Sequence, residues 1–361
     1  YEQTVGELEH GVGLNLLLVV DDGVKAISSN GKRVIFPAVV GSGRESMNFS
    51  LGHEAAANEQ KLDELHIQMN GKHYYVGEMA QRNATDYSRV FERVRFNHEY
   101  TMILLQTAIH LVTSPEETEI TLFTGLPLDY YKSQVKDFEA KLREPLPAFK
   151  WVSGGAAESL AKTIGAVKVF PQALSAIWAT LINAEGRVVH PELMQEGNQI
   201  AVIDIGFRTT DVCVVEMKKG GGFRPLLALC DTIDIGVVNL QDMIKTVYKD
   251  KTGGSNLSES KIERILSTKQ MKYKGKDVDF TSEVEKAHQS VVNAIEDRIS
   301  TLWKEEADTF DATFLLGGGG STFQSYFTNE YDTILDSQFA NAIGYYRLGK
   351  MLLGERLGQE K

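Results

Sequence analysis

The same pattern occurs twice in this chain, at positions about half its length apart: an apolar run followed directly by Asp-x-Gly. The first copy is "LLLVVDDG", residues 16–23, and the second is "QIAVIDIG", residues 199–206. Apolar runs rich in β-branched residues predict buried strands, and Asp and Gly after them predict a turn. A carboxylate at a buried strand end is costly unless water, a cation or backbone amides meet it. The repeat therefore predicts two similar halves, each carrying a hairpin.

The chemistry of the two hairpins suits a nucleotide. Asp21 and Asp204 can hold a hydrated divalent cation through water, and the glycines that follow them let the backbone approach phosphate oxygens. The hydroxyls of Thr209 and Thr210 add donors. Each copy alone could be an ordinary polar turn. Together they predict a nucleotide clamp.

A glycine-rich segment, "LLGGGGST" at residues 315–322, follows another apolar run. Glycines there permit positive φ angles and close approach of the backbone to a ligand. A helix that begins after them would offer amides to an anion or a sugar. A tight turn is the alternative, but beside the two hairpins the segment favours nucleotide contact.

Gln172 follows Pro171, which we expect in the first turn of a helix that Gly186 closes. A glutamine can orient a water molecule without taking its proton, which suits attack on a γ-phosphate. The alternative is a glutamine on a helix surface. Gln172 is thus a candidate for positioning the attacking water.

Length and charge narrow the class of protein. With 361 residues, two domains are expected, and 42% hydrophobic and 24% charged residues are typical of a globular chain. The net charge is −11, with 49 acidic against 38 basic residues. Direct binding to nucleic acid is therefore not expected, and any link to DNA would need an adaptor protein.

The cysteines and the first apolar run indicate the compartment. Cys213 and Cys230 lie in apolar runs and are expected to be buried reduced thiols, as in a cytoplasmic protein. The eight histidines show no zinc-site spacing. Residues 14–20 are too few to span a bilayer and follow acidic residues, so neither a membrane span nor a signal peptide is expected.

Periodicity predicts an alternation of strands and helices. Strands are expected at 14–20, 24–28, 33–40, 119–127 and 167–170, in a strand pair around 200–235, and before the glycines at 317–320. Helices are expected at 96–113, 128–142 and 171–186, after Gly236, and over most of 255–307. The Asn70-Gly71 pair predicts a hairpin turn.

These motifs together resemble the actin-like ATPase superfamily, above all bacterial plasmid-segregation actins of the ParM, StbA and Alp type and archaeal actin-like proteins. The segments that carry the resemblance are "VVDDG", "GKRVIFPAVVG", "TGLPLDYY", "FPQALSA", "IDIGFRTTD", "DIGVVNL", "FLLGGGGS" and "QFANAIGYY". They extend from about residue 16 to 349. The D-x-G-x-x-T-x-D spacing of residues 204–211 is the most specific of them.

The resemblance implies an α/β, actin-like (ribonuclease H-like) two-domain ATPase fold with a central nucleotide cleft. Domain I would comprise 1–170 plus 336–361, with a small insertion subdomain at about 41–95. Domain II would comprise 171–335, with a subdomain at about 236–307. A chaperone-type ATPase is not expected, because too few residues follow the glycine-rich segment for a peptide-binding domain.

The resemblance also implies roles for individual residues. Asp21 and Asp204 would face a water-held Mg²⁺ and, with Gln172 near the attacking water, form the catalytic set. The phosphate-binding set would be Gly23, Lys25, Gly206, Arg208, Thr209, Thr210 and Asp211. The adenosine-binding set would be Gly236, Gly317, Gly318, Gly319, Gly320 and Ser321. ATP and ADP are the expected nucleotides, with GTP as an alternative.

One departure from the family concerns the first hairpin, where the family has about three more residues between its glycine and its lysine. Here Lys25 follows Gly23 after one residue. Either the hairpin is shortened, which would weaken its grip on the γ-phosphate, or residues are missing from the chain. Residues 1–11 have no counterpart in the family.

By analogy, we expect an Mg²⁺-dependent ATPase that forms filaments of its own copies and moves or segregates plasmid DNA, or positions another cargo, with a DNA-binding adaptor as a further partner. The alternative is a soluble phosphotransferase, a small-molecule kinase of the same fold. Such kinases carry an added carboxylate base in a substrate pocket, for which the sequence offers no convincing candidate.

Overall fold

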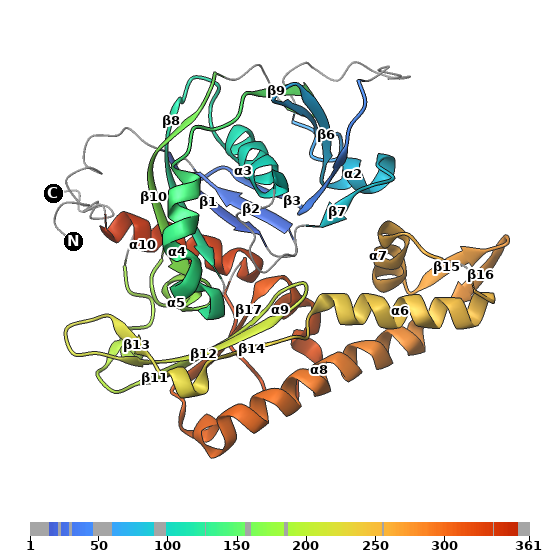
Figure 1. Ribbon diagram of the computed structural model, residues 1–361. Coiled ribbons are helices and arrows are strands. Elements are labelled where there is room, and N and C mark those ends of the chain that lie inside the picture. The colour runs from blue at the N-terminus through green and yellow to red at the C-terminus, as the bar shows by residue number, and fades with distance from the viewer. Residues whose placement is uncertain are drawn as a thin grey trace. The chain divides into compact units, whose positions relative to one another are not determined.

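The computed structural model describes residues 14–20, 23–28, 31–45, 60–89, 99–126, 128–155, 160–183, 187–254, 256–334 and 336–352. The chain divides into two compact units (Figure 1). Unit 1 comprises Tyr1–Val188 and Asn341–Lys361, and unit 2 comprises Val189–Ala340. The boundaries therefore fall later in the chain than the expected 170/171 and 335/336.

Unit 1 contains a mixed five-stranded sheet of order β10-β8-β1-β2-β3. Its strands are β1 (Leu14–Val20), β2 (Gly23–Ile27), β3 (Arg33–Pro37), β8 (Glu119–Leu126) and β10 (Thr163–Pro171). The β1, β8 and β10 strands are parallel, whereas β2 and β3 are antiparallel to their neighbours. The expected strand 33–40 is divided, because β3 ends at Pro37 and a new strand begins at Val39.

That new strand belongs to a second, antiparallel sheet of unit 1, of order β7-β4-β6-β5-β9. Its strands are β4 (Val39–Ser42), β5 (His66–Met69), β6 (Lys72–Val76), β7 (Ser88–Arg89) and β9 (Phe149–Ser153), and α2 (Glu78–Asn83) follows β6. The predicted β5–β6 hairpin is confirmed. Asn70 and Gly71 have φ angles of 48° and 80°, the positive values that a two-residue hairpin turn requires.

Helix α3 (Glu99–Val112) forms the centre of unit 1. It contacts β1, β2 and β3 of the first sheet and β4 of the second, and it is buried from Thr101 to Val112. A helix that is apolar nearly all round is stable only in such a core. Helix α4 (Leu128–Leu142) packs on β8 and β10.

Two further helices fix the boundary of unit 1: α5 (Leu174–Leu181) and α10 (Ala340–Leu352). The Arg347 guanidinium donates to the Ala179 carbonyl at 2.7 Å, and the Asn341 side chain accepts from the Ala173 amide at 2.9 Å. A Cβ atom on Gly344 would collide with the Ser175 carbonyl. Helix α5 therefore belongs to unit 1, which is why the first boundary lies after it.

The expected position of Pro171 was wrong. It is the last residue of β10, where it pairs with Leu126 of β8, and the helix begins only at Leu174. Parallel pairing along the whole of β8 extends the strand to this point. The expected end of the helix at Gly186 was also wrong, because α5 ends at Leu181 and Ile182 is already extended.

Unit 2 contains a sheet of order β13-β12-β11-β17, with β14 also paired to β12. Its strands are β11 (Gln199–Ile205), β12 (Thr210–Met217), β13 (Phe223–Pro225), β14 (Asp231–Ile233) and β17 (Ala312–Leu316). Short 3-10 helices are η2 (Pro191–Met194), η3 (Leu227–Leu229), η4 (Lys304–Thr309), η5 (Gln324–Tyr326) and η6 (Ser337–Phe339).

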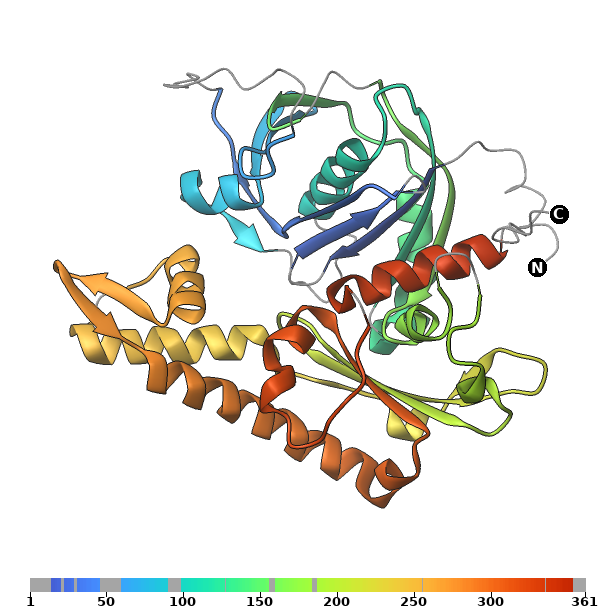
Figure 2. The same cartoon turned by 180° about the vertical axis from the view of Figure 1, so that it is seen from behind.

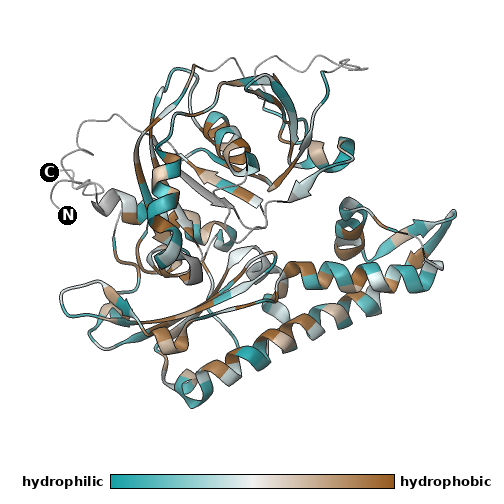
Figure 3. Ribbon diagram, in the orientation of Figure 1, coloured by the Kyte–Doolittle hydropathy of each residue, from teal (hydrophilic) through white to brown (hydrophobic). Residues whose placement is uncertain are grey.

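The helices of unit 2 are α6 (Val237–Thr252), α7 (Glu259–Thr268), α8 (Thr281–Trp303) and α9 (Gly317–Phe323). Along α8, buried residues recur every three or four positions, including Val284, Val291, Ile295 and Ile299, and Figure 3 shows the resulting alternation of apolar and polar residues. This stripe accounts for the packing of α8 against α6. Between α7 and α8 lies a hairpin that was not predicted, β15 (Gln270–Tyr273) and β16 (Lys276–Asp279).

None of the helices in the described parts of the chain combines the length and apolar character that crossing a bilayer requires.

Candidate functional site

The second Asp-x-Gly segment forms the predicted hairpin between β11 and β12. Ile205 pairs with Thr210, so residues 206–209 make the turn, which the Gly206 amide closes by donating to the Thr209 carbonyl at 2.8 Å. Asp204 lies directly opposite Asp211. Directly opposed residues share one face of a sheet, so the two carboxylates are neighbours. Both are nearly buried, with 7% and 8% of their surface exposed.

Strand β14 holds the β12 side of the hairpin. The Thr232 hydroxyl donates to Asp211 Oδ1 at 2.6 Å, and the Thr210 hydroxyl donates to the Ile235 carbonyl at 2.8 Å. Thr210 is fully buried. Its proton is thus used within the protein, which leaves the Thr209 hydroxyl and the exposed Arg208 as the polar side chains on the turn itself.

Helix α6 begins against the same turn. The amides of Val237 and Val238 donate to the carbonyls of Gly206 and Phe207 at 3.2 and 2.7 Å. A Cβ atom on Gly236 would lie 2.6 Å from the Phe207 carbonyl oxygen. Only glycine permits this contact, so Gly236 brings the helix N-terminus onto the hairpin.

The four glycines after β17 complete the cluster. Strand β17 runs parallel to β11, with Leu316 paired to Asp204. Gly317 has a φ angle of 83°, and a Cβ atom there would collide with Asp204 Oδ1 and the Ile205 carbonyl. The glycines form the first turn of α9 and not a loop, because Gly317 turns the chain from strand directly into helix (Figure 2).

Unit 2 therefore brings together most of its predicted site residues. Asp204, Asp211, Gly206, Gly236 and Gly317 all lie around the end of the β11–β12 hairpin. Sequence analysis missed Thr232, the hydroxyl that binds Asp211. It precedes Asp234-Ile235-Gly236, a third Asp-x-Gly segment that could have drawn attention to it.

Direct metal ligation has little support within the described ranges, where no three His, Cys, Asp or Glu side chains gather closely enough to hold an ion. A cation beside Asp204 would take its remaining ligands from water or from phosphate oxygens. The buried carboxylate pair at the end of the hairpin fits such a cation bound with a nucleotide.

In unit 1, β1 and β2 pair with Val20 opposite Val24, and Gly23 is the first residue of β2. The shortened first hairpin stays a prediction from the sequence, with missing residues as its alternative. Lys25 on β2 is buried, with 5% of its surface exposed. Asp21 lies outside the described residues.

Gln172 occupies the junction between β10 and α5. Its amide donates to the Leu126 carbonyl at 2.8 Å, and 5% of its surface is exposed. The alternative of a glutamine on a helix surface is therefore wrong.

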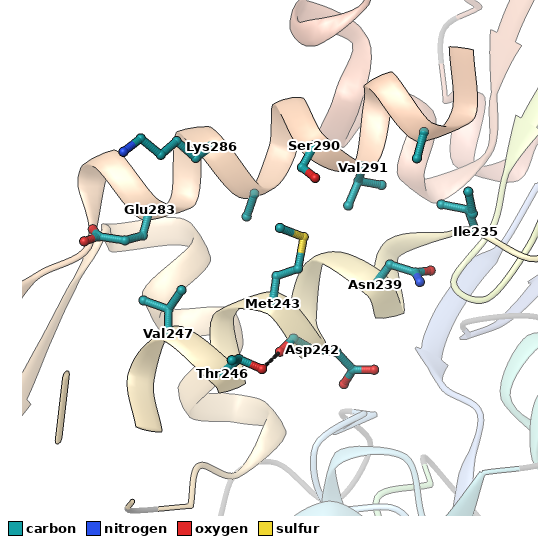
Figure 4. A pocket seen from close by; sticks show the side chains of 12 residues that line it. Ile235, Asn239, Asp242, Met243, Thr246, Val247, Glu283, Lys286, Ser290 and Val291 are labelled. Carbon is teal, nitrogen blue, oxygen red and sulfur yellow. Dashed lines mark hydrogen bonds between the residues drawn. The ribbon is translucent and has the colours of Figure 1, made fainter. Parts of the chain in front are cut away.

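A pocket of about 600 Å³ lies elsewhere in unit 2, between α6 and α8. Figure 4 shows Met243 of α6 pointing toward α8, with Glu283 and Lys286 at one end. None of the predicted site residues lines this pocket, although Ile235 and Asn239 flank Gly236. The pocket therefore shares no predicted site residue with the hairpin site.

Two family models match successive parts of the chain. Residues 22–174 match a model described as the N-terminal domain of actin-like proteins, and residues 202–329 match one described as the C-terminal domain of MreB-like archaeal actin homologues. Among curated proteins, a sequence search finds no match.

Solved structures match over nearly the full length. A 15-stranded ParM filament from Clostridium botulinum is 25% identical, with 94% of this chain and 99% of that chain covered and a TM-score of 0.80. The archaeal actin homologue Ta0583 in complex with ADP is 19% identical, with the same coverage and a TM-score of 0.73, and indicates the fold alone.

The two units, their sheets and the hairpin therefore define an actin-like two-domain fold. The N-terminal part of the chain is thus of the actin-like type and its C-terminal part of the MreB-like archaeal actin type, and ParM and the archaeal actin homologues are its structural relatives.

Proposed function

We propose that this chain binds a nucleoside triphosphate with Mg²⁺, hydrolyses it and assembles into filaments in its triphosphate state. ATP is the favoured nucleotide and GTP the alternative. The observation that carries the proposal is the buried Asp204–Asp211 pair, against which the Gly317 backbone packs directly at the end of the hairpin. A buried pair of like charges is costly, and a cation bound with a polyanion offsets that cost.

Each residue of unit 2 has a distinct role in this proposal. Asp204 orients water on Mg²⁺, while the Gly206 backbone and the Thr209 and Arg208 side chains meet the phosphates. Asp211, fixed by Thr232, holds the β12 side of the hairpin. Gly236, the glycines 317–320 and Ser321 border the adenosine, because backbone without side chains leaves room for a base and a ribose.

Unit 1 supplies the remaining proposed residues. Asp21 is the second carboxylate for the water-held cation, Gly23 and Lys25 meet the phosphates, and Gln172 orients the attacking water. Burial of Gln172 at a strand–helix junction supports this role, since a fixed side chain positions a water better than a mobile one.

The proposed assembly follows from relatives. The matching structures include a ParM filament and a ParM mutant described as non-polymerisable. For this chain we propose filaments of its own copies that move or segregate plasmid DNA through a DNA-binding adaptor, because a net charge of −11 disfavours direct contact with DNA.

Thermal melting with Mg²⁺ and ATP, ADP or GTP tests nucleotide binding. A ligand that binds only the folded state raises the melting temperature by mass action. We expect a rise for the wild type and none for Asp204→Ala. The matched control is Asp242→Ala, an exposed carboxylate on α6 that pairs with Lys245 and should leave the rise intact. No nucleotide effect on the wild type would contradict the proposal.

A further inference from the structure

The two cysteines of the chain lie next to each other in unit 2. Cys213 is on β12, and Cys230 immediately precedes β14, which pairs with β12. Val212 pairs with Asp231, so the same register continued by one residue places Cys230 opposite Cys213. Both are free thiols, and the Cys213 Sγ donates to the Cys230 Sγ at 3.5 Å. The two sulfur atoms are therefore already in contact.

The backbone already meets the requirements of a disulfide. Opposed residues in an antiparallel pair have Cα atoms about 4.5–5.5 Å apart, within the range of about 4.4–6.8 Å that disulfides span. From 3.5 Å, the sulfur atoms need to approach by about 1.5 Å to form the bond. Side-chain rotation supplies such a movement without rearranging the sheet.

The two thiols differ in their surroundings. Cys213 is fully buried, whereas Cys230 is only partly buried, so the expectation of two buried thiols was wrong for Cys230. The hydrogen bond from the Cys213 thiol lowers the pKa of Cys230, and the same bond raises the pKa of Cys213. Because the thiolate is the nucleophile, Cys230 is the sulfur that reacts first and Cys213 the one that resolves the product.

We propose that Cys213 and Cys230 form a reversible dithiol–disulfide site that reacts with hydroperoxides. The Cys230 thiolate attacks one peroxide oxygen, the O–O bond breaks, and Cys230 becomes a sulfenic acid while hydroxide leaves. The Cys213 sulfur then attacks the Cys230 sulfur, the S–O bond breaks and water leaves. In total, two thiols and one hydrogen peroxide give one disulfide and two water molecules.

The position of the site couples it to the hairpin. A bond between these sulfurs would join β12, which carries Asp211, to the segment that leads through β14 and Thr232 to Gly236. A cross-link in the native geometry restricts the unfolded chain, so we expect the melting temperature to rise by a few degrees. An accompanying change in nucleotide affinity rests on the proposed function, whereas the bond itself does not.

The test treats the folded, full chain with hydrogen peroxide, removes the excess with catalase, and alkylates the denatured protein with N-ethylmaleimide. Intact mass should show a chain that has lost two hydrogens and takes no alkyl group, and dithiothreitol should restore two alkylated cysteines. Two alkylated cysteines after peroxide, added oxygen without a disulfide, or disulfide-linked dimers would overturn the proposal.

Two variants test the order of reaction. In Cys213→Ala, Cys230 should accumulate a sulfenic acid that dimedone traps. In Cys230→Ser, a change at a half-buried position that should fold, Cys213 should resist peroxide. Rapid oxidation of Cys230→Ser would overturn the assignment of Cys230 as the attacking thiol.

A nucleotide titration of the oxidised wild type, compared with Cys230→Ser after the same peroxide treatment, tests the coupling to the hairpin. A changed Kd in the wild type alone supports it, and an unchanged Kd after complete disulfide formation overturns it. The mass measurement decides the dithiol chemistry even if the protein binds no nucleotide.

Discussion

Asp204 and Asp211 face each other across β11 and β12, an arrangement that like charges disfavour. The Thr232 hydroxyl, which donates to Asp211, offsets part of this cost. Asp204→Asn keeps the shape of the side chain and removes a charge. Without nucleotide, we expect its free energy of unfolding to equal that of the wild type or to exceed it by up to about 1 kcal/mol. Urea unfolding of the apo protein checks this. A loss of stability would show that Asp204 serves folding more than binding.

A substitution at Gly317 shows how closely the backbone packs against Asp204. Gly317→Ala adds a Cβ at a positive φ angle and against Asp204 Oδ1, so we expect a loss of about 2–4 kcal/mol. The matched control is Gly197→Ala, at a φ angle of 90° with no atom within 4 Å of the added Cβ. Gly197→Ala should lower the free energy of unfolding only by the cost of a positive φ angle, about 1 kcal/mol. Equal losses in urea unfolding would remove the argument for crowding at Asp204.

If Gln172 positions the attacking water, replacing it should slow hydrolysis without weakening nucleotide binding. Gln172→Ala should slow phosphate release by one to a few orders of magnitude while nucleotide affinity stays nearly unchanged, because misplacement costs about 100-fold in rate. Gln324→Ala, at an exposed position in unit 2, is the control. Both variants need a nucleotide titration on the same preparation. Unchanged release would leave Gln172 a buried structural residue, and lost binding would mean that its role was misassigned.

At the scale of elements, turn chemistry explains which parts were predictable. Asn70-Gly71 carries a strong hairpin signal, and the β5–β6 hairpin follows it. The β15–β16 hairpin has the same geometry, with Lys274 and Gly275 at φ angles of 49° and 80°, but lysine gives no such signal. The surrounding charged helical pattern concealed it.

Long-range pairing explains the parts that sequence alone could not give. Pro171 has the local character of a helix start, yet parallel pairing with β8 keeps it in β10. Residues 171–186 fall in the second domain that the resemblance implies, but hydrogen bonds to α10 hold helix α5 in unit 1. In contrast, the cluster around Asp204 was predictable, since the spacing of residues 204–211 predicts the hairpin that places Asp204 opposite Asp211.

The contact between α3 and β9 predicts acid sensitivity. His110 stacks on Phe149 with ring centroids 4.0 Å apart, and burial, with a smaller contribution from the Lys162 charge, lowers its pKa to about 3. The unfolded chain, with a pKa near 6.5, therefore binds a proton first. The contribution of neutral His110 to the free energy of unfolding is therefore fully present above about pH 6.5 and is lost as the pH falls toward 3. The loss from this group is at most about 1.4 kcal/mol per pH unit.

His110→Phe keeps the stacked ring and removes the titration. Urea unfolding at a series of pH values between 7 and about 4 should give a shallower decline for the variant than for the wild type. His66, whose pKa burial lowers to about 4, is still present in both proteins and contributes equally. If the free energy of unfolding fell equally with pH in both proteins, His110 would not cause the acid sensitivity.

At the scale of the whole molecule, we expect the first hairpin to be shorter than in the actin-like family that the chain resembles, since Lys25 follows Gly23 after one residue. Such a hairpin would offer few amides to a γ-phosphate, so we expect the second hairpin to carry more of the binding. We expect nucleotide affinity to depend strongly on Mg²⁺, because the cation, held beside Asp204, would then supply much of the phosphate neutralisation. A titration with and without EDTA measures this. Equal affinities would contradict the role of the cation.

The most direct test of the account is sedimentation with parallel light scattering after addition of Mg²⁺ and ATP over a range of protein concentrations. We predict that the protein scatters light and pellets with ATP above a threshold concentration, that ADP gives little assembly, and that Gln172→Ala assembles but disassembles slowly because its nucleotide stays unhydrolysed. If the protein binds nucleotide yet never assembles at any concentration, the filament is excluded and a phosphotransferase of the same fold is favoured.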